Sequence, residues 1–249
     1  MIGWRARLGF LVPPGNPTVE VEMGALAAVT GVSVHYTRMN ATGETGSLAG
    51  QNARNREQIA GLDANMALLC LVKPKVVVLA HTATSYTLGQ AEEAALVARM
   101  EERYATRFIT AFGSVVAGLR HLGVRTIAFG TPYAPEATLQ GKALLEAHGF
   151  AVVNHGNLPG VRNIYDETAE RAYGLGRLVD HPDAEALVLS GVGMPTLATM
   201  ATLERDLGKP VISAASGMMW NALRAAGLRE AVPGYGALLA GADGRSEGR

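Results

Sequence analysis

Two stretches of the 249-residue chain indicate its fold, LAHTATS at residues 79–85 and LSGVGMPT at residues 189–196. Each begins at the end of an apolar strand and continues into small and hydroxyl-bearing residues. A proline-containing turn precedes each stretch, VPPGN at residues 12–16 and GTPY at residues 130–133. The two halves of the chain therefore repeat one structural scheme, as a duplication of fold more than of sequence.

Short β-branched runs alternate with Ala- and Leu-rich stretches of helix length, among them 54–72 and 89–104. This alternation is typical of βαβ units around a parallel sheet. The predicted fold class is α/β, with two pseudo-symmetric half-domains that each contain a four-stranded parallel sheet flanked by helices. The predicted strands are Ala6–Val12, Ser33–Met39, Lys75–His81, Arg107–Thr110, Val124–Gly130, Phe150–His155, Ala186–Gly191 and Pro210–Ser213.

The repeat also predicts the domain organisation. Residues 1–112 and 214–240 are assigned to the first half-domain, and residues 113–213 to the second. Residues 241–249 are rich in glycine and charged residues and are expected to form a flexible tail. Because ligands bind beyond the carboxyl ends of the strands in open parallel sheets, the four quoted loops are expected to meet in a cleft between the half-domains.

The composition excludes several classes of function. The chain has 22 Lys and Arg residues, 22 Asp and Glu residues and 48% hydrophobic residues, as in a globular protein with a sizeable core. The zero formal net charge provides no basic surface for nucleic acid or an anionic membrane. No apolar run reaches the roughly 20 residues that span a bilayer, and the N-terminus runs into a strand without a secretion signal. The single cysteine, Cys70, excludes an internal disulfide, so a cytoplasmic protein without nucleic-acid or membrane partners is predicted.

No cofactor and no metal are expected. The Gly-x-Gly pattern at residues 191–193 lacks the third glycine and the acidic residue of a dinucleotide-binding loop. The sequence also lacks a phosphate-binding Walker loop, a His-x-x-x-His pair and clustered carboxylates.

The first half contributes two candidate elements of a site. Its His81 stands at the end of a buried strand, where an imidazole could transfer a proton, or could be a core histidine bonded to neighbouring backbone. The hydroxyl of Thr82 could bind a carboxylate or end the strand. Pro14 and Asn16 lie between a strand and a helix, where they could face an anion at the helix N-terminus or form a turn and a cap.

The second half contributes the facing elements. Tyr133 could hydrogen-bond a carboxylate or a developing enolate, or could be an aromatic lid on the rim of the cleft. Asn163 precedes a predicted helix, which it could cap, or it could point into the cleft. Gly191, Val192 and Gly193 carry no acid, base or nucleophile, but their backbone N–H groups could form an oxyanion site.

Several of these segments together resemble a known family. The chain is similar to the aspartate/glutamate racemase superfamily, in the branch of arylmalonate decarboxylases, maleate cis-trans isomerases and ectoine-utilisation EutA proteins. The resemblance implies two similar α/β half-domains, no cofactor, a small carboxylate bound between them, and one or two catalytic cysteines, one from each half. The matching segments are Leu11–Pro14, Gly123–Arg125, Thr131–Tyr133, Gly208–Ser213, Trp220 and Pro233–Gly236.

The chain departs from the family pattern at both cysteine positions. His81 occupies the first position and Gly191 the second, and Cys70 lies inside a predicted helix where it cannot replace either. Two-base racemisation and thiolate attack on an alkene are therefore unavailable. At the matching positions, the resemblance implies that Asn16, Tyr133 and Asn163 bind carboxylate and that Thr82 is the hydroxyl residue after the first cysteine position.

We therefore predict a cofactor-independent lyase or isomerase that acts on a small carboxylate by proton transfer, through decarboxylation or isomerisation, with His81 in place of the usual cysteine. The predicted catalytic residues are His81 and Tyr133. The predicted substrate-binding residues are Pro14, Asn16, Thr82, Tyr133, Asn163, Gly191, Val192 and Gly193. One alternative is a hydrolase of a carboxylated amide or lactone with His81 as general base, and another is a non-catalytic carboxylate-binding protein. The sequence leaves open whether the protein forms a homo-oligomer.

Overall fold

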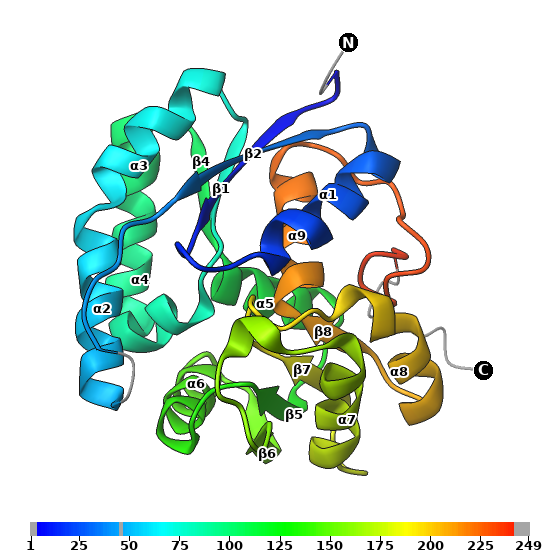
Figure 1. Cartoon of the computed structure of the whole chain (residues 1–249). Coiled ribbons are helices and arrows are strands. Elements are labelled where there is room, and N and C mark those ends of the chain that lie inside the picture. Colours follow the sequence, from blue (N-terminus) through cyan, green and yellow to red (C-terminus); the bar gives the residue numbers. More distant parts are fainter. Residues whose placement is uncertain (1–3, 45–46, 242–249) are drawn as a thin grey trace.

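The computed structural model describes residues 4–44 and 47–241 and contains two four-stranded parallel sheets (Figure 1). The strand order is β2-β1-β3-β4 in the first sheet and β6-β5-β7-β8 in the second. Because the two orders are equivalent, the predicted α/β fold with two similar halves is confirmed. The strands are β1 Arg7–Val12, β2 Ser33–Arg38, β3 Val76–Leu79, β4 Arg107–Thr110, β5 Thr126–Thr131, β6 Ala151–Asn157, β7 Ala186–Leu189 and β8 Val211–Ser213.

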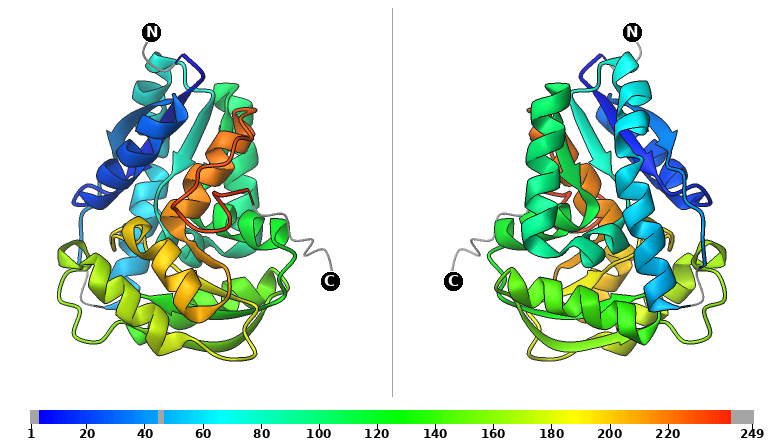
Figure 2. Two further views of the ribbon diagram at one scale, coloured as in Figure 1. Left: turned by 90° about the vertical axis from the view of Figure 1, so that its right-hand side faces the viewer. Right: turned by 90° about the vertical axis from the view of Figure 1, so that its left-hand side faces the viewer.

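Helices cover both sheets, with α1, α2, α3 and α4 around the first and α6, α7 and α8 around the second (Figures 1 and 2). The helices are α1 Thr18–Thr30, α2 Leu48–Ala60, α3 Leu62–Leu69, α4 Thr82–Tyr104, α5 Ala111–His121, α6 Pro135–Ala147, α7 Ala169–Val179, α8 Met200–Leu207 and α9 Ala214–Ala225. The described residues also form three short 3-10 helices, η1 Cys70–Val72, η2 Ile164–Asp166 and η3 Leu197–Thr199. None of the described helices is both long and apolar enough to cross a bilayer.

The central strands have apolar residues on both faces because helices pack on both sides of each sheet. Every residue of β3 and of β7 is buried. One large apolar core extends through both halves, and a smaller cluster fills the space between the first sheet and helices α3 and α4.

The chain passes from the first sheet to the second through α5 and returns through α9, and these two helices pack against each other. Helix α9 also contacts β3 and β4 of the first sheet and β8 of the second. The assignment of 214–240 to the first half-domain, like the other domain boundaries, therefore stays a prediction. Of the expected tail at 241–249, residues 242–249 lie outside the described residues.

Two helices differ from their predicted bounds. The predicted helix 54–72 consists of α2 and α3, which meet at Gly61, and a 3-10 turn. Helix α4 consists of two helical segments that meet at a kink at Gly89, whose φ/ψ angles are not helical (φ 70°, ψ 176°); the predicted helix 89–104 matches the second segment, and the first, which begins at Thr82, was not predicted. Glycine accommodates this conformation because it has no Cβ. As a result His81 occupies the N-cap position of α4, and the hydroxyl residues after it form the first helical turn.

Buried polar side chains at the start of α1 hold the two halves together. Asn16 donates from Nδ2 to the backbone oxygen of Val192 (3.1 Å), and its Oδ1 accepts from the first N–H groups of α1. Thr18 donates from Oγ1 to the backbone oxygen of Gly193 (2.8 Å). These bonds fix the glycine-containing loop of the second half against the first half.

Glu22, one turn further along α1, completes this connection. Its Oε1 accepts from the backbone N–H groups of Thr196 (2.6 Å) and Leu197 (2.7 Å) in the second half. Burial raises the pKa of Glu22 from the ordinary 4.5 to about 7, although the two N–H donors lower it. The carboxyl group therefore titrates near neutral pH while it holds the two halves together.

Replacing Glu22 with glutamine is expected to change how stability depends on pH. Because the pKa is raised in the folded state, the free energy of unfolding of the wild type falls as the pH rises from about 4.5 to about 7, by up to roughly 3 kcal/mol from this group. The amide of Glu22→Gln accepts the same two bonds without ionising. Urea unfolding should therefore show this variant to be more stable than the wild type at pH 8 and similar to it at pH 4.5.

Glu20→Gln is the matched control, because Glu20 lies on the same helix in an exposed ion pair with Arg38. It should change stability by at most about 1 kcal/mol and leave the pH dependence in place. If Glu22→Gln retains the wild-type fall in stability between pH 4.5 and 8, the assignment of that fall to Glu22 is wrong.

Candidate active site

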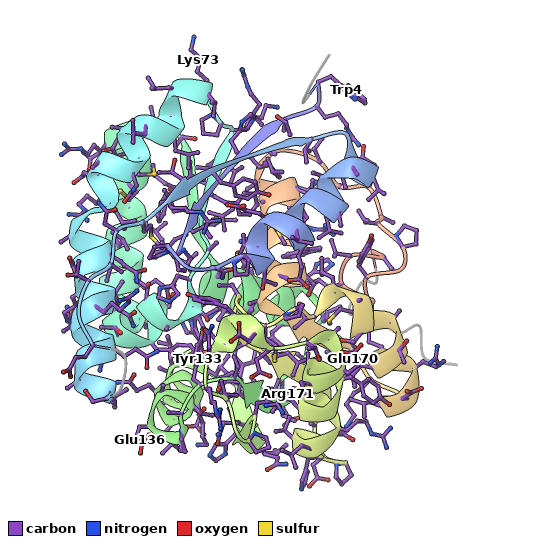
Figure 3. The ribbon with its side chains drawn as sticks, in the orientation of Figure 1. Trp4, Lys73, Tyr133, Glu136, Glu170 and Arg171 are labelled. Atoms are coloured by element: carbon purple, nitrogen blue, oxygen red, sulfur yellow. The ribbon has the colours of Figure 1, made fainter. Side chains whose placement is uncertain are left out.

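A cavity of about 490 Å³ lies between the two halves, beyond the carboxyl ends of strands in both sheets. The first half contributes Pro13, His81 and one face of α2 to its wall. The second half contributes residues from the segments 132–135 and 157–165. Figure 3 shows Tyr133, one of these residues, where the two halves meet. The cavity thus lies between the two halves, but only three of the four loops expected to meet there contribute to its lining, and the loop 189–196 does not.

His81 lines this cavity and is 9% exposed. Its Nδ1 lies 2.6 Å from Oγ1 of Thr84 in the first turn of α4. Thr84 is buried, and its hydroxyl has no other partner among the described residues, so the hydroxyl must donate to Nδ1 for its hydrogen to be bonded. This arrangement puts the ring hydrogen on Nε2, the nitrogen without a hydrogen bond to the described residues.

The imidazole of His81 is neutral in the empty cleft at pH 7. Burial lowers its pKa from 6.5 to about 4, and the positive charge of Arg54 lowers it further. An anion bound beside the ring would oppose both effects, because an opposite charge nearby favours the protonated form. His81 therefore has the properties of a group that takes up a proton when a carboxylate binds.

A pair of buried hydroxyls lies next to the histidine. Oγ1 of Thr82 and the phenol oxygen of Tyr133 are 2.9 Å apart, and they join α4 of the first half to the loop after β5 of the second. Only one hydrogen can lie between the two oxygens, so the other is available to an acceptor. Burial raises the pKa of Tyr133, so the phenol stays protonated and remains a donor.

A second pair of buried hydroxyls lies beside Tyr133 and helps to fix its position. Tyr86 and Ser190 are bonded through their hydroxyls (2.5 Å), again between the two halves. The ring of Tyr86 meets that of Tyr133 edge to face, with centroids 6.0 Å apart. Gly141 in α6 leaves space for the ring of Tyr86, because a Cβ at this position would lie 2.7 Å from that ring. The position of Tyr133 is thus set from both halves.

The segment 191–193 lies behind the cavity wall and does not line it. A Cβ on Gly193 would lie 2.9 Å from the ring of Tyr165, which does line the cavity. The backbone N–H groups of Val192 and Gly193 are buried and donate no hydrogen bond within the described part of the chain. Nearly all buried N–H groups in proteins are paired, but these two belong to a segment that does not line the cavity, so an oxyanion site here stays a prediction.

Gly191, at the second cysteine position, has no room for a side chain. Its φ angle is +100°, and a Cβ there would lie 2.7 Å from two ring carbons of Pro132. A thiol at this position is therefore excluded by packing as well as by sequence.

The remaining predicted residues differ in whether they line the cavity. Asn163 lines the cavity and also caps η2, through Oδ1 and the N–H of Tyr165 (3.2 Å). Pro14 does not line the cavity, although its neighbour Pro13 does. Asn16 is fully buried and its amide bonds both α1 and the second half. Substrate binding by Pro14 and Asn16 stays a prediction.

Sequence reasoning missed most of the cavity lining, including Arg54, Gln58 and Tyr165. Arg54 and Gln58 belong to one face of α2, where polar residues recur at positions 51, 54, 55 and 58. This helical spacing of polar residues was the available signal, but only packing distinguishes it from a solvent-exposed face. Within residues 4–44 and 47–241, no three His, Cys, Asp or Glu side chains are grouped as metal ligands.

Comparison with known proteins supports the same family. Residues 8–239 match the sequence profile of arylmalonate decarboxylase. The chain is 34% identical to the maleate isomerase of Nocardia farcinica, over 94% of this chain and 95% of the relative. It is 33% identical to the arylmalonate decarboxylase of Bordetella bronchiseptica, over 66% of this chain and 70% of the relative.

The fold agrees with these sequence matches. The solved structure of the Nocardia farcinica maleate cis-trans isomerase, a cysteine-to-serine mutant with a covalently bound succinylcysteine intermediate, superposes with a TM-score of 0.84 at 30% identity, and the match covers 94% of this chain and 98% of that one. The relatives named here are enzymes, one group of isomerases and one of lyases. The chain therefore belongs to the arylmalonate decarboxylase family, within the aspartate/glutamate racemase-like branch that also contains the maleate isomerases.

Proposed function

We propose that this protein is a cofactor-independent decarboxylase of a small carboxylate, in which His81 delivers the proton in place of a cysteine. The observation that carries the proposal is the position of His81, a titratable side chain that lines the cleft and whose Nε2 forms no hydrogen bond with the described residues. The family relationship supports a small carboxylate as substrate, since the relatives act on maleate and arylmalonates.

The carboxylate that remains in the product is assigned to the first turn of α4 and the hydroxyl pair. The side chain of His81, the N-cap residue, does not cap this helix, so the N–H groups of the first turn are available to an anion. The free hydroxyl hydrogen of the Thr82–Tyr133 pair can donate to the same carboxylate. These donors would stabilise the enediolate that forms when the second carboxylate leaves.

The proposed decarboxylation needs a proton donor on only one face of the substrate α-carbon. The bond between the α-carbon and the departing carboxylate breaks, carbon dioxide leaves, and the electron pair is delocalised into the remaining carboxylate. The imidazolium of His81, formed as the anion binds, gives the Nε2 proton to the α-carbon and later takes up another from water. Gly191 cannot supply a second acid or base, which favours this sequence over racemisation or a thiolate-based isomerisation.

Replacing His81 with glutamine is expected to abolish most of the activity. The variant keeps an amide of similar size but cannot donate the proton, so kcat should fall by roughly 10²–10⁴-fold. Affinity for an unreactive carboxylate should change little, as measured by calorimetry. His155→Gln, at an exposed position on β6, is the matched control and should keep full activity.

Isotopes distinguish the alternative functions. Turnover in heavy water should place deuterium on the product carbon, whereas oxygen-18 from water in the product would support hydrolysis with His81 as base. If neither the wild type nor His81→Gln turns over any of a panel of malonates, maleate, amides and lactones, and both bind carboxylates equally, the protein is a binding protein and the proposed reaction is wrong.

The pH dependence distinguishes an acid from a base. Because the pKa of His81 is lowered to about 4 in the empty cleft, the protonated fraction falls about tenfold for each pH unit above that value. If His81 acts as the acid, kcat/KM should fall with slope −1 from about pH 6 to pH 8, and the same slope in Glu22→Gln would exclude the titration of Glu22 as its cause. A flat profile over this range would instead identify His81 as a base.

Gly191→Cys is expected to destabilise the protein without creating an isomerase. A side chain at this position meets the Pro132 ring and requires a positive φ, so the free energy of unfolding should fall by about 1–3 kcal/mol in urea. Gly174→Cys, in α7, has no atom near the new Cβ and should be neutral. Wild-type stability of Gly191→Cys together with maleate isomerisation would refute the packing argument.

A further inference from the structure

Helix α2 buries polar side chains where a helix in a globular protein normally buries apolar ones. Its buried residues are Asn55 and Gln58. With Gln51 and Arg54 they follow the spacing i, i+3, i+4 and i+7, which places all four on one face of the helix, and all four line the cavity. We call these four residues the α2 polar face.

Gln58 has no hydrogen-bond partner in the described part of the chain. Its side chain is 3% exposed, and its Oε1 is buried without a donor. An unpaired buried amide is unfavourable, and such groups in native proteins usually have a partner. Gln58 lines the cavity, and rotation of its amide by 180° exchanges Oε1 and Nε2, so it can present its donor to a bound molecule.

Arg54 forms no salt bridge with a described residue, although its charge contributes to the lowered pKa of Glu57 on the same helix. No carboxylate lies within 4 Å of it among the described residues, and its one hydrogen bond is long, from Nη1 to the backbone oxygen of Gly43 (3.4 Å). Its charge reaches the reaction centre, since it contributes to the lowered pKa of His81. It also opposes the burial that raises the pKa of Tyr165.

The charge of the described cavity wall is positive. Arg54 and Arg162 both line it, and no Asp or Glu does. His81 and Tyr133 form one part of the wall and the α2 polar face forms another, whereas Thr82, which is bonded to Tyr133, does not line the cavity. A volume of about 490 Å³ is within the usual range for sites that hold a whole small-molecule ligand, roughly 300–1,000 Å³, so it has space beyond one carboxylate.

We propose that the α2 polar face is a specificity subsite for an acidic substituent on the substrate, bound by the guanidinium of Arg54 and by the amide of Gln58, whose Nε2 donates to the carboxylate. The substrate class is then a carboxylate whose reacting carbon carries a flexible acidic side chain in place of an aryl group. The guanidinium matches a carboxylate in both charge and geometry. This inference rests on the proposed function for the reacting end of the substrate, but binding at the subsite can be measured without turnover.

The experiment uses two readouts. Calorimetry compares glutarate, which has a terminal carboxylate, with butyrate and phenylacetate, which do not. Kinetics compares 2-(2-carboxyethyl)malonate with phenylmalonate. The variants are Arg54→Met and Gln58→Leu, with Arg56→Met as the matched control, because Arg56 lies on the exposed side of the same helix in an ion pair with Glu92 (3.3 Å). Circular dichroism confirms that each variant is folded.

The wild type should bind glutarate more tightly than butyrate or phenylacetate. Arg54→Met should weaken glutarate binding by roughly tenfold to a hundredfold and leave phenylacetate unchanged. Gln58→Leu should have a smaller effect of the same kind, and Arg56→Met should stay within about twofold of the wild type. Where malonates turn over, the kcat/KM values should follow the same order.

The proposal is overturned if glutarate does not bind, if phenylacetate binds as tightly as glutarate, or if Arg54→Met weakens both ligands equally. Glutarate binding that depends on Arg54, without turnover of either malonate, would support the subsite and reject the proposed decarboxylation. Turnover of phenylmalonate in preference to the acidic malonate would support decarboxylation and reject the subsite.

Discussion

The site depends on the buried hydrogen bonds between the start of α1 and the segment 191–197 of the other half. Four backbone groups of that segment are hydrogen-bonded to the side chains of Asn16, Thr18 and Glu22. The segment is too irregular to pair these groups within its own sheet. Because an unpaired buried backbone group is costly, these bonds fix the distance between the two halves. The cavity, the hydroxyl pair at Tyr133 and the position of His81 all follow from that distance.

The two halves share a fold but carry different functional groups at equivalent positions. The ends of β3 and β7 are equivalent in the two sheets, yet one carries an imidazole that lines the cleft and the other a glycine in contact with Pro132. The Nocardia farcinica relative forms a covalent cysteine intermediate, whereas this chain has no thiol at either strand end. A cleft with a titratable group at only one of these two positions is suited to transferring a proton to one face of a carbon.

Burial moves the titratable groups at the junction towards their neutral forms. It lowers the pKa of His81 and raises the pKa of Glu22 and Tyr133. Arginine keeps its charge in such surroundings, so Arg54 and Arg162 give the cavity a positive potential in a chain of zero formal net charge. An anionic ligand in this cavity would therefore meet polar groups that are mostly uncharged, and its charge would favour protonation of His81.

The sequence by itself determined the α/β class, the two equivalent halves and the positions of all eight strands to within three residues, because alternating apolar strands and helices encode parallel sheets locally. It also indicated His81 and Tyr133, which follow strand ends. Only the tertiary structure decided that α4 begins at Thr82, that Pro132 fills the space beside Gly191, and that the α2 polar face lines the cavity. Those features depend on contacts between residues far apart in the chain, and a local pattern of polar residues does not show whether they face solvent or a buried cavity.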